Sequence, residues 1–275
     1  MKEVVEVFPP SWLLGIRFCI AGALLLVIIW KRVKQHFTPY ALRAGIILGI
    51  LDYAGYYTQT VGLQSVTPGV NAFLTATYCV IVPFVWWFVA RKRPTVRNIG
   101  AALLAVVGIW FVSVTGGETG FHIGFGETMT LVCAVFFAIH MVYVSQFSLF
   151  YDVLMLTVFQ FFTEGVLGLI VGASFETFPA LSAITPDVIV QMAILIVFAS
   201  VLCFCAMNIA LAHVPPAQSS LILCLESVFG VFFSILLYGE QLTGRLILGF
   251  CLIFIAILLS EGLLKKLPAL LRIKR

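Results

Sequence analysis

Four ionisable residues, Arg17, Asp52, Glu164 and Glu226, lie near the centres of long apolar stretches of this 275-residue chain. Burying a charged side chain in a membrane helix costs roughly 2.5–3.5 kcal/mol, so each of the four requires a partner or a function. Burial also favours the uncharged form of a carboxyl group, so Glu226 could exchange protons or recognise an amine. The guanidinium group of Arg17 could in turn bind a carboxylate.

Arg17 and Asp52 carry opposite charges on consecutive apolar stretches, at about the same depth. We expect an ion pair between them that holds the two helices together. Two alternatives for Arg17 are contact with a substrate carboxylate and an extended conformation that reaches the membrane surface. For Glu226 the alternative to a functional role is a protonated or hydrogen-bonded side chain between helices. For Glu164 we expect a structural role.

Tyrosine and amide side chains accompany these charges. Tyr53 and Tyr57 share one helix face with Tyr56, because the spacing is three and four residues. Such a face suits the wall of a cavity that stacks on a metabolite and offers a few hydrogen bonds. An aromatic belt at the membrane surface is the competing interpretation. The predicted wall consists of Tyr53, Tyr57, Asn71, Tyr78, His140, Asn208 and Glu226.

The composition identifies the surroundings of these residues as a membrane. Hydrophobic residues make up 62% of the chain and charged residues 10%, against about 45–50% and 25% in soluble domains. This balance excludes a soluble enzyme, a disordered protein and a nucleic-acid-binding domain. The apolar runs are continuous for about 20 residues, which fits membrane helices rather than the alternating strands of a barrel. The predicted fold class is an all-α, polytopic membrane protein.

Nine spans follow from the apolar runs and from the Pro, Gly and Thr residues that separate them. Because the connecting loops are short, the function must lie within the bilayer. The predicted spans are 10–30, 41–62, 68–90, 99–115, 124–146, 153–173, 188–211, 216–238 and 243–264.

The basic residues predict the orientation. If the spans alternate, 13 of the 16 Lys and Arg residues fall on one side, in the first loop, the third loop and the C-terminal tail. Basic loops remain in the cytoplasm, so we expect a multi-pass protein of the cell (inner) membrane with its C-terminus in the cytoplasm.

The two halves of the chain resemble each other at an offset of 148 to 149 residues, for example at Thr67-Pro68-Gly69 and Pro215-Pro216-Ala217. We expect a first repeat over 1–117 and a second over 118–275, inserted with opposite orientations. Span five has no partner in the first half, so a helix is expected to precede Met1 and to complete a ten-helix (5+5) fold. The alternative is a genuine nine-span protein.

The run from Val214 to Leu221, then Leu225-Glu226-Ser227, Leu237-Tyr238-Gly239-Glu240 and Gly249, resembles the second-repeat signature of the EamA type in the drug/metabolite transporter superfamily. Arg17-Phe18, Thr67-Pro68-Gly69, Asn71, Pro83 and Gly100 resemble the first-repeat counterpart. This resemblance implies a ten-helix exporter or facilitator of small metabolites, such as amino acids. It differs at Ser227, where the family pattern has Pro, and in lacking the first helix.

The function expected from these features is secondary transport by alternating access between two inverted repeats. The expected partners are a small-molecule metabolite, protons and the lipid bilayer, with no nucleic acid. The Gly45-x-x-x-Gly49 and Gly168-x-x-x-Gly172 patterns permit close helix approach, either within the chain or in a homodimer. The alternatives are a non-transporting or truncated membrane scaffold and, less favoured, a membrane enzyme. The sequence contains no catalytic cluster, no metal site and no cofactor motif.

Overall fold

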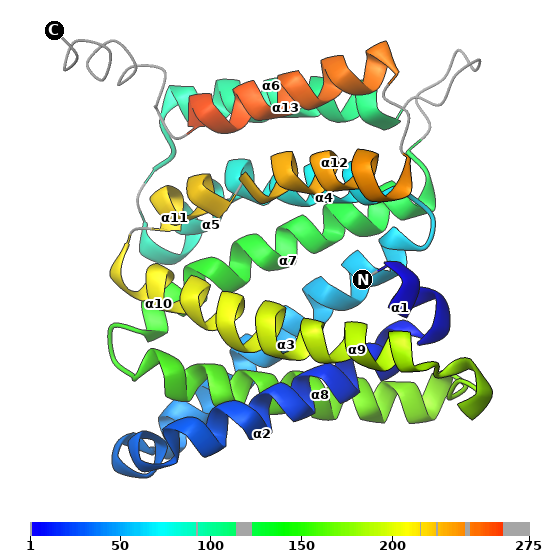
Figure 1. Ribbon diagram of the computed structural model, residues 1–275. Helices are drawn as coiled ribbons and strands as arrows, with labels where there is room; N and C mark the ends of the chain where they lie inside the picture. The colour runs from blue at the N-terminus through cyan, green and yellow to red at the C-terminus, as the bar shows by residue number, and fades with distance from the viewer. Residues whose placement is uncertain are drawn as a thin grey trace, which may run out of the picture.

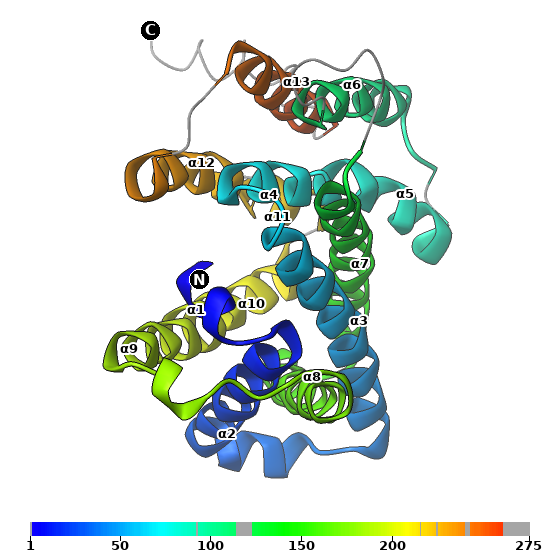
Figure 2. The same cartoon turned by 90° about the vertical axis from the view of Figure 1, so that its right-hand side faces the viewer.

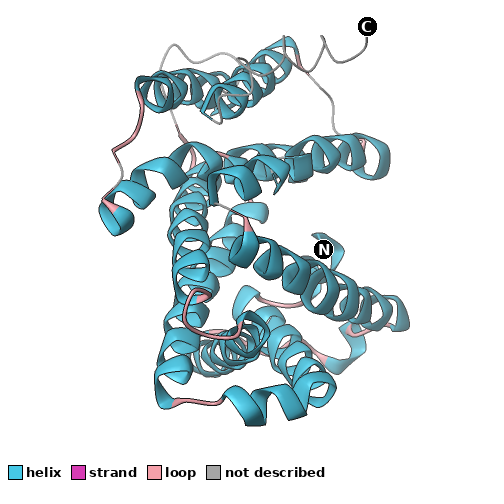
Figure 3. Cartoon of the chain, turned by 90° about the vertical axis from the view of Figure 1, so that its left-hand side faces the viewer, coloured by secondary structure: helices cyan, strands magenta, loops and turns pink. Residues whose placement is uncertain are grey.

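The computed structural model describes residues 2–91, 93–113, 123–214, 216–223, 225–239 and 243–260, and this part of the chain consists of helices and the loops that connect them (Figure 3). It confirms the predicted all-α fold class. The helices in chain order are α1 (Lys2–Val7), α2 (Pro10–His36), α3 (Pro39–Leu63), α4 (Pro68–Ala76), α5 (Tyr78–Ala90), α6 (Val96–Ser113), α7 (Phe125–Phe147), α8 (Val153–Phe175), the short η1 (Leu181–Ala183), α9 (Pro186–Ile194), the π-helix η2 (Leu195–Phe204), α10 (Cys205–His213), α11 (Pro216–Leu223), α12 (Leu225–Tyr238) and α13 (Gly244–Ser260).

Each of the nine predicted spans corresponds to a helical segment within the described ranges. The third span consists of α4 and α5, the seventh of α9, η2 and α10, and the eighth of α11 and α12. The first span continues to His36, beyond its predicted end at residue 30. The predicted end of the ninth span, after residue 260, lies outside the described residues, as does the expected repeat boundary at 117/118.

The long helices have the length and composition of membrane spans. Five helical segments meet both requirements, and α6, α12 and α13 provide shorter apolar helices. Large apolar side chains point outward, including Val27 at 78% exposure and Phe175 at 84%. Such a surface is stable against lipid tails and costly in water. The protein is therefore a multi-pass membrane protein.

Threonine followed by proline begins three of the helices. The Thr38 hydroxyl accepts a hydrogen bond from the Ala41 backbone N–H at 3.1 Å, and Thr67 and Thr185 accept equivalent bonds three residues ahead. The proline that follows each threonine has no N–H to satisfy, so it fits the first position of a helix. These pairs set the points at which α3, α4 and α9 begin.

Helices α2 and α8 form the closest pair and lie side by side at one end of the bundle (Figures 1 and 2). Gly168 packs against the backbone of Gly15, and Gly172 packs against the ring of Trp12. Gly45 and Gly49 of α3 likewise lie against α8. Both small-residue patterns are therefore covered by contacts within the chain, in agreement with the packing alternative.

The remaining helices form layers above this pair. Helices α3 and α7 cross the middle of the molecule, α4 packs along α12, and α6 and α13 form a separate pair at the far end (Figure 1). One buried apolar cluster lies mainly around α2, α8 and the α9–α10 segment, and a second lies around α4, α5, α7 and α13. The polar residues considered below lie where these two groups face each other.

Candidate functional site

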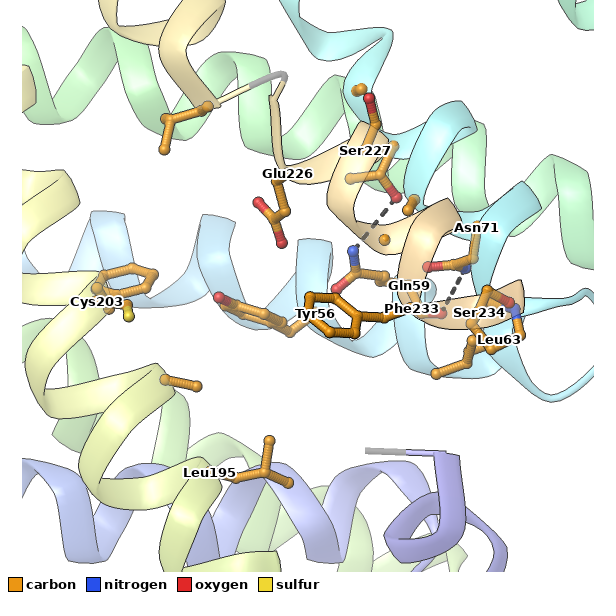
Figure 4. Close-up of a pocket in the computed structure, with 18 of the residues that line it drawn as sticks. Tyr56, Gln59, Leu63, Asn71, Leu195, Cys203, Glu226, Ser227, Phe233 and Ser234 are labelled. Carbon is orange, nitrogen blue, oxygen red and sulfur yellow. Dashed lines mark hydrogen bonds between the residues drawn. The ribbon is translucent and has the colours of Figure 1, made fainter. Parts of the chain in front are cut away.

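A cavity of about 660 Å³ lies between the α2, α3 and η2 side of the molecule and the α4 and α12 side. Figure 4 shows Glu226 pointing into this space above Tyr56, and Gln59 Nε2 donates a hydrogen bond to Thr75 Oγ1 at 3.3 Å. Most of its wall is apolar, which suits the binding of a small molecule by a few well-placed polar groups. Its polar lining residues are Arg17, Tyr56, Gln59, Asn71, Thr75, Tyr78, Cys203, Glu226, Ser227 and Ser234.

Arg17 is held in this wall by contacts on one side of its guanidinium group. Its Nε donates a hydrogen bond to the Ser200 hydroxyl at 2.7 Å. The guanidinium carbon lies 4.7 Å from the ring centre of Phe18 and 5.3 Å from that of Tyr56, distances typical of cation–π contacts. No described residue accepts a hydrogen bond from its Nη atoms, so they are available to an anion in the cavity.

The expected ion pair between Arg17 and Asp52 is not formed. Both side chains are buried, at 3% and 1% exposure, but Arg17 bonds to Ser200 whereas Asp52 Oδ2 accepts a hydrogen bond from Gln160 Nε2 at 2.9 Å. The ring of Tyr56 occupies the space beside the guanidinium group. The rotation of the two helices, which gives the two side chains different hydrogen-bond partners, was not predicted.

Ser200 meets Arg17 because the backbone around it is a π-helix. Its own hydroxyl donates to the carbonyl of Leu195, five residues earlier, at 3.2 Å. A π-helical segment shifts the side chains that follow it relative to an α-helix and is often found at functional sites. The sequence stretch Leu195–Phe204 is apolar apart from this serine, and the sequence reasoning did not identify it.

Glu226 lines the same cavity from α12, with a side chain exposed to that space. Arg17 belongs to α2, and Figures 1 and 2 show α2 and α12 in different layers of the molecule. The cavity therefore presents a cationic group on one side and a carboxyl group on another. An arrangement of this kind is complementary to a ligand that carries both charges.

A second polar group, around Asp52, lies next to a smaller cavity of about 80 Å³. His140 Nδ1 is 3.9 Å from Asp52 Oδ1. The Nδ2 atom of Asn208 donates to Gln160 Oε1 at 3.4 Å and to Thr157 Oγ1 at 3.0 Å. Asp52 and His140 line the small cavity, whereas Asn208 lines neither cavity and bonds to Gln160, the partner of Asp52.

The tyrosines of α3 divide between two positions. Tyr56 lines both cavities. Tyr53 and Tyr57 stack on each other with ring centres 5.8 Å apart, and the Tyr53 hydroxyl donates to Ser11 Oγ at 3.1 Å. Neither of these two rings contributes to the wall of either cavity, so the predicted wall is not met at Tyr53 and Tyr57. The three tyrosines spread over a wide part of the helix surface, and of the three only Tyr56 faces the cavities.

Helices α4 and α5, which form the third span, supply two more of the predicted residues. Asn71 lines the large cavity and its Nδ2 donates to Thr130 Oγ1 at 3.0 Å and to the Gln59 carbonyl at 3.3 Å. Tyr78 lines both cavities. The structure thus places Asn71, Tyr78 and Glu226 of the predicted wall, together with Arg17 and Tyr56, around the large cavity.

Comparison with known proteins identifies the family. The sequence profile of the EamA-like transporter family matches residues 1–114 and 124–261. The chain is 32% identical over 216 residues to an uncharacterized transporter of Archaeoglobus fulgidus, a match that covers 78% of this chain and 67% of that protein. It is 24% identical to the uncharacterized transporter YoaV of Bacillus subtilis, over 94% of this chain and 90% of that protein.

A solved crystal structure of a protein shares the fold, with a TM-score of 0.68 at 15% sequence identity. This similarity covers 94% of the present chain and 90% of the solved one. The family match extends over nearly the whole chain and includes the helices that line both cavities. The chain therefore belongs to the EamA-like transporter family of the drug/metabolite transporter superfamily, whose members are transporters and not enzymes.

Proposed function

We propose that the protein is a secondary transporter that carries a small zwitterionic metabolite, an amino acid or a related compound, by alternating access. The observation that carries this proposal is that Arg17 and Glu226 line one cavity. The Nη atoms of Arg17, which form no hydrogen bond with the described residues, would bind the substrate carboxylate, and the Glu226 carboxylate would bind its ammonium group. Charge-assisted hydrogen bonds of this kind are roughly twice as strong as neutral ones.

The rest of the cavity wall suits the uncharged part of such a substrate. Tyr56, Phe204 and Phe233 provide aromatic surface, and Gln59 and Asn71 provide amide groups. The volume of about 660 Å³ falls within the usual range for small-molecule sites, about 300–1,000 Å³. The wall can therefore accommodate a side chain as well as the two charged groups.

The transport cycle that we propose is a rocking motion of two inverted repeats, 1–117 and 118–275, about this cavity. The similarity of the two halves at an offset of 148 to 149 residues supports it.

We propose an orientation with the C-terminus in the cytoplasm of the cell (inner) membrane. The end of α2, the connection from α5 to α6 and the end of α13 all lie at the same end of the bundle, the left side of Figure 1. These segments adjoin most of the basic residues, which remain on the cytoplasmic side of membranes. Lys92 and the basic residues from 265 onward lie outside the described residues.

Counterflow in proteoliposomes tests the proposed substrate class. Vesicles preloaded with an unlabelled L-amino acid should take up the labelled one, and each amino acid is compared with its amine-only and carboxylate-only analogues as competitors. Each analogue lacks one charge-assisted contact worth about 1.5–3 kcal/mol, so we expect it to compete at least about tenfold more weakly.

Two variants test which residue binds which charged group of the substrate. Arg17→Gln should abolish the preference over the amine-only analogue, and Glu226→Gln the preference over the carboxylate-only analogue. Cys203→Ser is the matched control, because Cys203 lines the same cavity without carrying either charge. Equal competition by all three compounds, or no exchange by folded protein, would contradict the proposed function.

A further inference from the structure

Two carboxyl groups that the proposed function does not use lie close together inside the bundle. Asp52 of α3 and Glu164 of α8 are 1% and 0% exposed. Gln160, one turn before Glu164 on α8, donates to Asp52 Oδ2 at 2.9 Å, which brings the two carboxyl groups into direct interaction. A contact of this kind needs a proton, because two carboxylates have only acceptor atoms.

Three of the four carboxyl oxygens of the pair have no hydrogen-bond donor among the described residues. Gln160 donates to Asp52 Oδ2, but Asp52 Oδ1 and both oxygens of Glu164 accept no hydrogen bond from the described residues. Buried polar atoms are rarely left without partners, and buried carboxyl groups this close do not both ionise. One proton shared between the two groups supplies the missing bond and removes the repulsion.

Other titratable groups surround the pair from each helix packed against α3. On α7, His140 Nδ1 is 3.9 Å from Asp52 Oδ1 and its Nε2 has no partner among the described residues. Cys133 of the same helix also interacts electrostatically with Asp52. On α2, Arg17 interacts electrostatically with both carboxyl groups.

The remaining titratable groups lie on α3 itself and across the small cavity. Tyr56, one turn after Asp52, interacts electrostatically with both members of the carboxyl pair, and Tyr53, next to Asp52, interacts with Glu164. Glu226 lines the same small cavity from α12, with Tyr78 beside it. Arg17 is thus the permanent cation that balances the acidic groups here.

A route for protons connects the pair with the substrate cavity. The small cavity of about 80 Å³ is lined by Asp52 and His140 and shares Tyr56, Gln59 and Glu226 with the large one. Its volume is sufficient for at least two water molecules, each of which occupies about 30 Å³ in the liquid. Water there would join Asp52 to the space in which a substrate binds.

We infer that Asp52 and Glu164 form one proton-binding site, which holds a single proton at rest and gains a second when an anionic group binds Arg17. With one proton the pair carries one negative charge, which balances the positive charge of Arg17. A carboxylate that binds the Nη atoms of Arg17 takes over that balance, so the pair gains a second proton. Binding of the anionic group to Arg17 therefore favours binding of the second proton, and the second proton favours binding of that group by the same free energy. The coupling to a substrate rests on the proposed function, whereas the shared proton does not.

Infrared spectroscopy of the purified protein tests the shared proton without any substrate. Wild-type protein at neutral pH should show a protonated-carboxyl absorption that either Glu164→Gln or Asp52→Asn removes completely. The carboxyl group that remains then faces Arg17 without a like charge and ionises. Glu226→Gln is the matched control and should leave this absorption in place. An absorption unchanged in Glu164→Gln and Asp52→Asn would overturn the inference.

Proteoliposomes test the coupling separately. For an amino acid that wild-type protein exchanges, one coupled proton per substrate permits about tenfold accumulation per unit of imposed pH gradient. Glu164→Gln, which keeps the shape of the side chain, should retain counterflow and lose this accumulation. Accumulation at the wild-type level in Glu164→Gln would overturn the coupling. Absence of any exchange by wild-type protein would instead contradict the proposed function, while the infrared result still decides the shared proton.

Discussion

Gly168 of α8 lies directly against Gly15 of α2, so closely that a Cβ atom on Gly168 would be 2.5 Å from the backbone nitrogen of Gly15. The same Cβ would be 2.8 Å from the carbonyl oxygen of Ser11. Real Cβ atoms do not approach backbone atoms this closely, so the two helices touch only because both residues lack a side chain. Since α2 carries Arg17 and α8 carries Glu164, this contact sets the spacing of both polar groups.

We expect Gly168→Ala to lower the free energy of unfolding by about 1–3 kcal/mol, because the backbone of α2 would have to move. Thermal unfolding of the purified protein measures this change. Gly100→Ala is the control, since nothing lies within 4 Å of the added Cβ and alanine favours a helix. Equal melting temperatures for the two variants would show that α2 and α8 do not pack as the structure has them.

Glu176, which follows α8, caps the N-terminus of α2. Its carboxylate accepts hydrogen bonds from the backbone N–H of Ser11 at 3.0 Å and from the Ser11 hydroxyl at 2.9 Å, and Trp12 N–H is 3.3 Å away. A carboxylate at a helix N-terminus is stabilised by the unpaired N–H groups and by the helix dipole. Glu176→Ala should therefore cost about 1–2 kcal/mol of stability. Glu127→Gln is the comparison, because Glu127 lies in the first turn of its own helix, α7. Its effect should be smaller, and a larger one would contradict this account of the α2 cap.

Asp152 links α8 to α2 at the ends of these helices opposite Glu176, and its two carboxylate oxygens make two separate contacts. Its Oδ1 accepts from the Met155 backbone N–H at 3.0 Å and begins α8, while its Oδ2 accepts from Arg32 Nε at 2.7 Å. The Arg32 side chain is half exposed, so this ion pair contributes less than about 1 kcal/mol. We expect Arg32→Gln and Asp152→Asn to cost similarly little in a chemical unfolding experiment. Asp152→Ala should cost about 1 kcal/mol more, because it also removes the cap. Equal costs for Asp152→Ala and Arg32→Gln would be evidence against the capping role.

The helices were predictable because continuous apolar runs and Thr-Pro boundaries are properties of the sequence itself. The predicted span start at residue 68 is confirmed, and the helices predicted to begin at residues 41 and 188 begin two residues earlier, at Pro39 and Pro186. The short helix α1 and the π-helical turns between Leu195 and Phe204 were not predicted. Both depend on contacts with distant helices, and the apolar pattern is the same for a π-helix and an α-helix.

The depth of the polar residues was also predictable, whereas their partners were not. Counting residues along each span predicted one level for Arg17, Asp52, Glu164 and Glu226; the first three are buried, whereas Glu226 is exposed to the cavity. The rotation of each helix about its axis decides which side chains meet, and it is set by contacts such as Gly15 with Gly168. For this reason the Asp52–Glu164 contact and the turn of Tyr53 away from the cavity could be found only in three dimensions.

Ser200 should act as a positioning residue for Arg17. Because its hydroxyl accepts the Arg17 Nε–H at 2.7 Å and is fully buried, Ser200→Ala leaves that donor without a partner. The loss of such a bond costs about 1–3 kcal/mol. We expect the KM of an exchanged amino acid to rise about tenfold, which corresponds to a loss of about 1.4 kcal/mol in binding free energy. The competition by its amine-only analogue should stay unchanged, since that analogue has no carboxylate to place.

Two variants separate this role from a merely structural one. Ser200→Thr retains a hydroxyl and should restore the wild-type KM. Ser174→Ala removes an exposed serine that donates only to its own helix, at the Ile170 carbonyl, and should leave the KM unchanged. If Ser200→Ala weakened the amino acid and the amine-only analogue to the same extent, the serine would stabilise the bundle without orienting Arg17. The substrate carboxylate would then have to be recognised elsewhere in the cavity.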